Sequence, residues 1–393
     1  MRKRIMIAIF KYRSGQGSHL RVGVLTLVIC LLLTACDKDN HISETKIAPA
    51  RTILFYMGGD NNLSSEVNSK IEQLKNVKIS PYSRVLIYTD TKDDFPQLLE
   101  VSTTSGGNIL KTLREYPESN SADAEIFSSV LSEIRKHYPS SSYELVLFSH
   151  ATGWLPEGAY NNPSGSSRNV ESRSILLDGN SEMEIPAFAA AIPDGMFDFI
   201  VFEACYMASV EVAYELKDKT RFIVASSAEI VSPGFSRCYA EALPLLYQQK
   251  VDLQGFCRAI EKDYATRPDD YSSLTLSLID TKGLDALASI VRESSSSFPD
   301  NGAGIQTFDR GSGTLFFDLE DCYSKSVKQQ AAIRAAIKDC VKWKTATPAF
   351  MPTYGGFNIR AHCGLTTYIM QQGSNLLNKA YKELKWYKSI TKE

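Results

Sequence analysis

Short apolar runs that alternate with amphipathic stretches constrain the fold of this chain more than any other feature. Between residues 51 and 230 the runs are RTILFYMGG, RVLIYTD, YELVLFSH, FDFIVFEA and RFIVASSAEI. Such runs fit strands that are buried on both faces, and the amphipathic stretches fit the helical crossovers that parallel strands require. We therefore predict an α/β fold over residues 51–245, with a mostly parallel sheet covered by helices on both faces.

The remainder of the chain is predicted to be richer in helices. Residues 246–393 hold several amphipathic stretches and three strand-like runs, SLTLSLID, GTLFFDLED and CGLTTYIM. A chain of 393 residues is long enough for one large α/β domain or for two ordinary ones. We expect residues 246–393 to form a helix-rich C-terminal part that packs on the core.

The first 35 residues are typical of a signal peptide. They carry six basic side chains and no acidic one, and the apolar run VGVLTLVICLLLTA is short for a membrane span. The run ends in Leu33–Cys36, which resembles the lipobox of bacterial lipoproteins, where the cysteine is acylated after cleavage. We expect residues 1–35 to be removed, Cys36 to carry lipid and residues 36–50 to form a polar tether. An uncleaved anchor is the alternative.

These expectations place the protein in a bacterial cell envelope, attached to a membrane through lipid on a face that the sequence leaves open. The net charge is −2, and no basic patch with interleaved aromatic residues occurs, so nucleic acid is not an expected partner. No CxxC or HExxH spacing supports a metal site. The sequence identifies no cofactor with certainty and leaves the need for calcium open.

Two reactive side chains follow consecutive apolar runs. His150 ends YELVLFSH, and Cys205 comes directly after FDFIVFEA, where a helix is expected over residues 207–218. The carboxyl ends of parallel strands meet at one edge of a sheet, so the imidazole and the thiol should lie near each other. A cysteine nucleophile needs such a base and proton donor. The alternatives are a buried cysteine that acts as a small hydrophobe and a histidine satisfied within the core.

Four segments together resemble the clostripain family of cysteine peptidases. They are FYMGGDNNL, LVLFSHATGW, FDFIVFEACYMASVEVAYEL and FIVASSAEIVSPGF, between about residues 51 and 235. The resemblance implies a caspase-like fold shared with gingipain, legumain and separase, a Cys205–His150 dyad, and cleavage of peptides or proteins after Arg or Lys. The chain departs from the family in having Ala151 where glycine is usual and Glu203 where aspartate is usual.

Carboxylates near the thiol are candidate substrate-binding groups. Glu203 lies two residues before Cys205, so strand alternation puts both side chains on one face, and Glu229 ends the next run. Either could bind a basic substrate side chain. The alternative is a carboxylate paired with an internal Lys or Arg.

A long loop rich in Gly, Pro, Asn and Ser separates His150 from the next strand, over Thr152–Arg173. Arg168 and Arg173 in this loop are candidate self-cleavage positions for an enzyme that cuts after basic residues. The alternative is an ordinary exposed loop. For the whole protein, the alternatives to a basic-specific peptidase are one of other specificity and a catalytically silent surface lipoprotein that binds peptides or proteins.

Overall fold

The computed structural model describes residues 50–157, 175–179, 181–310 and 314–391. The expected lipid site Cys36 and the candidate cleavage positions Arg168 and Arg173 lie outside these residues. Residues 48–393 cluster as one compact unit. No helix in the described ranges has the length and apolar character needed to cross a membrane.

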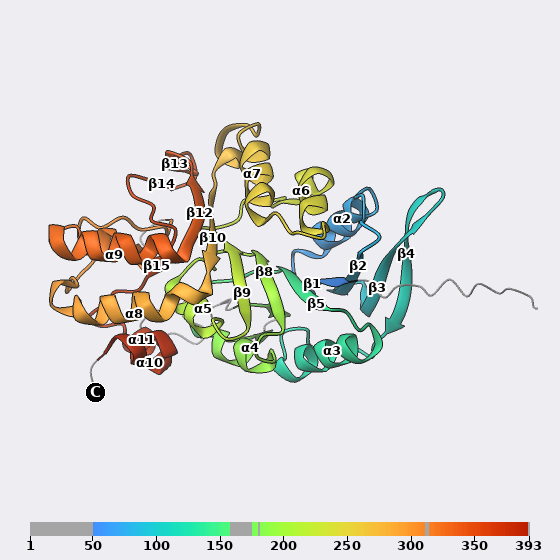
Figure 1. Ribbon diagram of the computed structural model, residues 1–393, viewed down its shortest axis with the longest axis horizontal. Coiled ribbons are helices and arrows are strands. Elements are labelled where there is room, and N and C mark those ends of the chain that lie inside the picture. The colour runs from blue at the N-terminus through green and yellow to red at the C-terminus, as the bar shows by residue number, and fades with distance from the viewer. Residues whose placement is uncertain (1–49, 158–174, 180, 311–313, 392–393) are drawn as a thin grey trace, which may run out of the picture. The chain divides into compact units, whose positions relative to one another are not determined.

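A nine-stranded sheet forms the centre of this unit, in the order β12-β10-β9-β8-β5-β1-β2-β3-β4 (Figure 1). The five middle strands are mutually parallel, which confirms the fold predicted from the apolar runs. Both edges of the sheet are antiparallel. The strands are β1 Arg51–Gly59, β2 Ser83–Thr91, β3 Asp94–Thr104, β4 Gly107–Glu115, β5 Ser142–Phe148, β8 Phe197–Glu203, β9 Thr220–Ala225, β10 Thr275–Asp280 and β12 Val341–Ala346.

Helices cover the two faces of the sheet (Figure 1). On one face lie α2 Ser64–Leu74, α6 Tyr239–Leu246 and α7 Leu253–Tyr264. On the other lie α3 Ala124–His137, α4 Ile185–Ala191 and α5 Val210–Glu215. In α3 the buried residues recur every three or four positions, and the Asp123 side chain caps the first turn by accepting two backbone N–H groups.

The C-terminal part contains helices and also completes the sheet. Its helices are α7, already described, and α8 Leu284–Glu293, α9 Val327–Cys340, α10 Asn375–Glu383 and α11 Lys385–Ile390. It supplies the edge strands β10 and β12, of which only the first was predicted. Short strands pair outside the main sheet: β6 Leu177–Asp178 with β7 Ser181–Glu182, β11 Phe317–Asp318 with β15 Thr366–Thr367, and β13 Ala349–Phe350 with β14 Phe357–Asn358.

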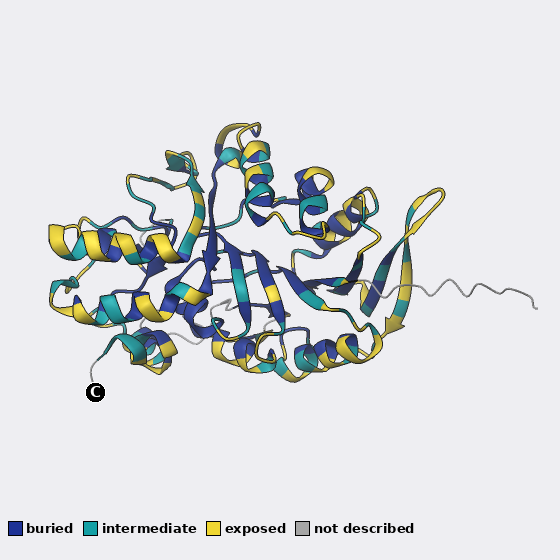
Figure 2. Ribbon diagram, in the orientation of Figure 1, coloured by how far each residue is buried: buried dark blue, intermediate teal, exposed yellow. Residues whose placement is uncertain are grey.

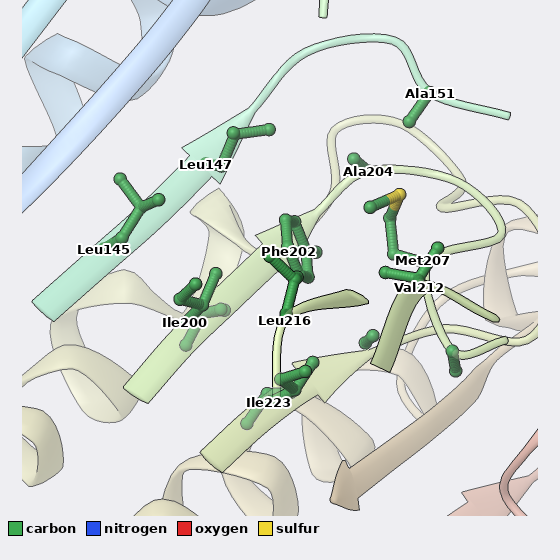
Figure 3. Packing of buried hydrophobic residues seen from close by; sticks show 14 of the residues in the cluster. Leu145, Leu147, Ala151, Ile200, Phe202, Ala204, Met207, Val212, Leu216 and Ile223 are labelled. Carbon is green, nitrogen blue, oxygen red and sulfur yellow. The ribbon is translucent and has the colours of Figure 1, made fainter. Parts of the chain in front are cut away.

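Alternation along β5 and β8 divides their side chains between two buried layers. The middle strands are buried over most of their length (Figure 2). Leu145, Leu147, Ile200 and Phe202 pack together on one face of the two strands (Figure 3). The intervening residues, which include Phe148 and Glu203, therefore face the other layer, where α2 and α6 lie.

Candidate active site

His150 and Cys205 follow neighbouring strands, and each lies two residues beyond the end of its strand. β5 and β8 are adjacent and parallel, and Phe148 is the register partner of Glu203. Each reactive residue lies two positions beyond this pair, and neighbouring strands are about 4.8 Å apart. The sequence left open whether the two strands are adjacent or one strand apart. They are adjacent, and the shared register puts His150 and Cys205 equally far beyond the carboxyl ends of their strands.

The His150 ring is oriented by a side chain from a third strand end. Asn62 follows β1, the other neighbour of β5, and its Oδ1 lies 2.6 Å from His150 Nε2. A carbonyl oxygen only accepts, so Nε2 carries a proton and Nδ1 is the nitrogen able to take the thiol proton. Asn62 was not identified from the sequence as part of the site. The available signal for a role in the active site was that Asn62 follows a strand whose carboxyl end lies at the same end of the sheet as those of β5 and β8.

Cys205 differs from the other described cysteines in its exposure. It is partly exposed, whereas Cys238, Cys257, Cys322, Cys340 and Cys363 are buried, and all six are free thiols. Burial raises the pKa of both Cys238 and Cys340 to about 12. The backbone N–H of Ile230 donates to Cys205 Sγ at 3.3 Å, a contact that stabilises negative charge on sulfur. Cys205 is thus the described cysteine best placed to react.

The helix expected over residues 207–218 begins later and is shorter than predicted. α5 starts at Val210 and has only six residues, because residues 204–209 form a turn and an irregular segment. In that segment Ala208 donates its N–H to the carbonyl of Ser226 at 2.9 Å. The reactive character of Cys205 therefore cannot be ascribed to a helix N-terminus.

The loops after His150 and Cys205 fit closely against each other. Tyr206 has a φ of 60°, uncommon for a residue with a side chain, and Gly153 has a φ of 67°. A Cβ atom at Gly153 would lie 2.7 Å from the carbonyl oxygen of Tyr206. The Tyr206 ring stacks on Phe316 with centroids 4.5 Å apart. Glycine is required at position 153 by both its backbone angle and this approach.

Ala151 needs no unusual backbone angle, although glycine is usual there in the family that the sequence resembles. The non-glycine residues with positive φ in the described ranges are Tyr206, Asp269 and Met351. The change to alanine therefore imposes no left-handed backbone conformation at this position. Tyr206 donates its N–H to the carbonyl of Ala228 at 2.9 Å, so it is not available to a substrate oxygen.

Glu203 is occupied by contacts within the protein. Its side chain is fully buried, and its Oε1 accepts bonds from Lys70 Nζ and from the N–H of Phe235, both at 2.5 Å. Its Oε2 accepts from the Tyr239 hydroxyl at 2.6 Å. The structure thus matches the alternative left open by the sequence, a carboxylate paired with an internal lysine.

Glu229 is also paired. The Arg310 guanidinium binds it through two nitrogens, with Nη2 at 2.9 Å from Oε1 and Nε on Oε2. Ile230, the next residue, contacts the Cys205 sulfur, so this ion pair lies beside the nucleophile. About a third of the Arg310 side chain and a fifth of Glu229 are exposed.

The C-terminal part packs against the loop that carries His150. Trp154 is buried, and its ring contacts those of Tyr368 and Tyr381 at centroid distances of 4.9 and 5.5 Å. Within the described ranges, no group of three or more His, Cys, Asp or Glu side chains is arranged to hold a metal ion.

Comparison with known proteins identifies related sequences and structures. Residues 55–351 match the sequence profile of the clostripain family. Clostripain from Hathewaya histolytica is 25% identical over 240 residues, which cover 51% of this chain and 44% of that protein. The matched region thus spans less than half the length of that relative.

Two solved structures resemble the chain over most of its length. An inactive zymogen of a C11 protease from Parabacteroides distasonis is 28% identical, with a TM-score of 0.76, and the match covers 88% of this chain and 99% of that one. A secreted C11 cysteine protease from Bacteroides thetaiotaomicron is 26% identical, with a TM-score of 0.77, and covers 88% and 100%. A complex of a secreted C11 cysteine protease from the same organism with an irreversible peptide inhibitor gives a TM-score of 0.75 at 25% identity, covering 87% and 99%.

Proposed function

Because the chain belongs to the clostripain family of cysteine peptidases, we propose that it is an endopeptidase with Cys205 as nucleophile and His150 as base and acid. The observation that carries the proposal is the shared register of the two residues beyond β5 and β8. The partly exposed thiol among five buried cysteines supports it. Peptides and proteins are the proposed substrates.

The proposed reaction has two stages. In the first, Nδ1 of His150 takes the thiol proton, the sulfur attacks the peptide carbonyl, and His150 returns the proton to the leaving amine. In the second, His150 takes a proton from water, whose oxygen displaces the sulfur and releases the new carboxyl group. The N–H of Ala151 donates to no other group in the described part of the chain, and we assign it to the oxygen that becomes negative.

Variants at the dyad test this function. Cys205→Ala should abolish cleavage of a fluorogenic peptide library, and His150→Ala should lower kcat/KM by roughly 10²–10⁴-fold, since base and acid are lost together. Both variants should keep the circular dichroism spectrum of the parent protein. Full activity in either folded variant would refute the assignment. An unmodified protein that cleaves no peptide and whose Cys205 resists iodoacetamide would instead be the silent binding protein.

Cleavage after Arg or Lys is the specificity implied by the family. Both carboxylates predicted to read such a residue, Glu203 and Glu229, are held by internal cations. We therefore propose that basic residues are accepted but not strongly preferred. The same library measures this preference.

We further propose an exported, lipid-anchored protein in a bacterial cell envelope. The expectation rests on residues 1–35 and Cys36, and the secreted relative from Bacteroides thetaiotaomicron supports export. Mass spectrometry of membrane-extracted protein should find a mature chain that begins at an acylated Cys36. An intact upstream sequence or a free Cys36 thiol would refute the anchor.

We also propose self-cleavage at Arg168 or Arg173, two basic residues in the loop after His150. The inactive zymogen among the relatives supports a maturation step. Purified active protein should convert to two chains on incubation, whereas Cys205→Ala should stay single. A single chain in both samples would exclude self-processing under those conditions.

A further inference from the structure

A buried ammonium group lies on the face of the sheet below the proposed nucleophile. Lys70, in α2, is fully buried although it carries a charge. Its Nζ binds Glu203 Oε1 at 2.5 Å and the carbonyl of Pro233 at 2.8 Å. It also lies 4.3 Å from the centroid of the Phe148 ring and 5.7 Å from that of Tyr239. Carboxylate, carbonyl and aromatic faces together form a cation-binding position.

The position lies where the substrate residue before the cleaved bond would extend. That residue presents its carbonyl carbon to Cys205 Sγ, so its side chain starts beside the thiol. Glu203 ends β8 and lies two residues before Cys205, so the Cα atoms of the two residues are at most about 7 Å apart. A long basic side chain that starts beside the thiol is long enough to span this distance to the Glu203 carboxylate.

We propose that Lys70 occupies the cation position beneath Cys205 in place of a substrate side chain and so determines the specificity of the peptidase. The inference rests on the proposed peptidase function. With Lys70 bound, the protein should discriminate little between basic and uncharged residues before the cleaved bond.

The contacts of Lys70 leave no vacancy for a second cation. Its ammonium has three donors, and besides Glu203 and Pro233 it meets Glu66 Oε1 at 3.4 Å. The other oxygen of Glu66 accepts a bond from Ser232 Oγ at 2.7 Å. A substrate cation could reach Glu203 only by displacing Lys70 from all three acceptors.

The loop that contains Gly234 and Phe235 covers the ion pair of Lys70 and Glu203. Phe235 donates its N–H to Glu203, and Gly234 has a φ of 64°. A Cβ atom at Gly234 would lie 2.2 Å from Glu203 Oε1 and 3.1 Å from Lys70 Nζ. The ion pair is therefore covered by backbone that approaches as closely as glycine allows.

Removal of the lysine tests the proposal through a gain of selectivity. The substrates are fluorogenic peptides that are identical except for Arg, Lys, Gln or norleucine before the cleaved bond. In the unmodified protein, kcat/KM for basic and uncharged peptides should differ by less than about tenfold. Lys70→Ala removes the cation and the volume it fills, and should raise the basic-to-neutral ratio by roughly tenfold or more, the effect of a charge-assisted bond.

A double variant is the matched control. Lys70→Ala leaves Glu203 buried without its cation and destabilises the fold, whereas Lys70→Ala/Glu203→Gln removes both charges and should melt at a higher temperature than the single variant. The double variant should return the ratio to that of the unmodified protein. A ratio above about 100-fold in the unmodified protein, or an equal ratio in all three proteins, would overturn the inference.

The failure of the inference can be distinguished from that of the function. Strong preference for Arg or Lys in the unmodified protein leaves the peptidase intact and removes only the role of Lys70. Absence of cleavage with every peptide, together with an unreactive Cys205, would overturn both. If Lys70→Ala does not fold, Lys70→Ser, whose small polar side chain also frees the position, replaces it in the comparison, and the same rise in the ratio is expected.

Discussion

At the scale of single residues, the site depends on how the imidazole is held. The Oδ1 atom of Asn62 lies 2.6 Å from His150 Nε2, and the two residues are 88 positions apart in the sequence. The bond is exposed to solvent, so Asn62 orients the ring without being buried. Loss of this partner removes a contact that holds the imidazole in its orientation.

We therefore expect Asn62→Ala to lower kcat by roughly 10- to 100-fold, a part of what general acid–base catalysis supplies, with little change in KM. Asn62→Asp keeps an acceptor at the same place and should retain most of the turnover. Steady-state kinetics on one fluorogenic peptide measure both effects. Equal losses in the two variants would show that position 62 matters for some reason other than accepting a bond from His150.

At the scale of elements, strand β2 carries a buried acid close to another from β6. Asp90 is 1% exposed and lies beside the Asp178 carboxylate. Burial and the nearby Asp178 carboxylate raise the pKa of Asp90 to about 8. Because this folded-state pKa exceeds that of the unfolded chain, the contribution of Asp90 to stability is fully present at low pH and is lost as the pH rises from about 4 to about 8.

Asp90→Asn should remove much of this dependence. Each pKa unit between the folded and unfolded states is worth about 1.4 kcal/mol, so the variant should gain a few kcal/mol over the parent at pH 8. Urea unfolding at pH 5 and pH 8 in a Cys205→Ala background measures this. Asp93→Asn, an exposed acid on the following turn, is the control and should leave the pH dependence unchanged. An Asp90→Asn variant that loses stability with pH as the parent does would contradict the assignment.

The elements also show which parts of the structure a sequence can predict. The five parallel strands were predicted because each is one apolar run buried on both faces. The hairpin of β3 and β4 was not, because β4 lies at the sheet edge and exposes most of its side chains. His150 and Cys205 directly follow apolar strands. Lys70, by contrast, lies in a polar helix 133 residues before Glu203, and its local sequence is that of a solvated lysine.

At the scale of the whole molecule, the C-terminal part is integral to the peptidase core. β10 pairs with β9 and β12 pairs with β10, so the sheet is finished by residues beyond 270. Trp154, in the loop after His150, packs on Tyr368 and Tyr381. The boundary predicted at residue 245 therefore separates segments that share one sheet and one buried cluster.

A fragment of residues 51–245 should consequently fail to fold by itself. It would expose the edge of β9 and the apolar side chains that β10 and the C-terminal helices cover. We expect residues 48–391 with Cys205→Ala to unfold in one cooperative thermal transition and the shorter fragment to show none. Circular dichroism at increasing temperature makes the comparison. A cooperative transition in the fragment would establish residues 51–245 as an independent domain.

The fit of Gly153 against Tyr206 bears on how such enzymes can be recombined. The loop that bears the histidine and the loop that bears the cysteine touch backbone to backbone, where no side chain can adjust to a poor match. Chimeras that inherit both loops from one parent should yield folded protein more often than chimeras that take one loop from each. The two loops would then be exchanged between relatives as a single cassette, although the residues they carry are far apart in the gene.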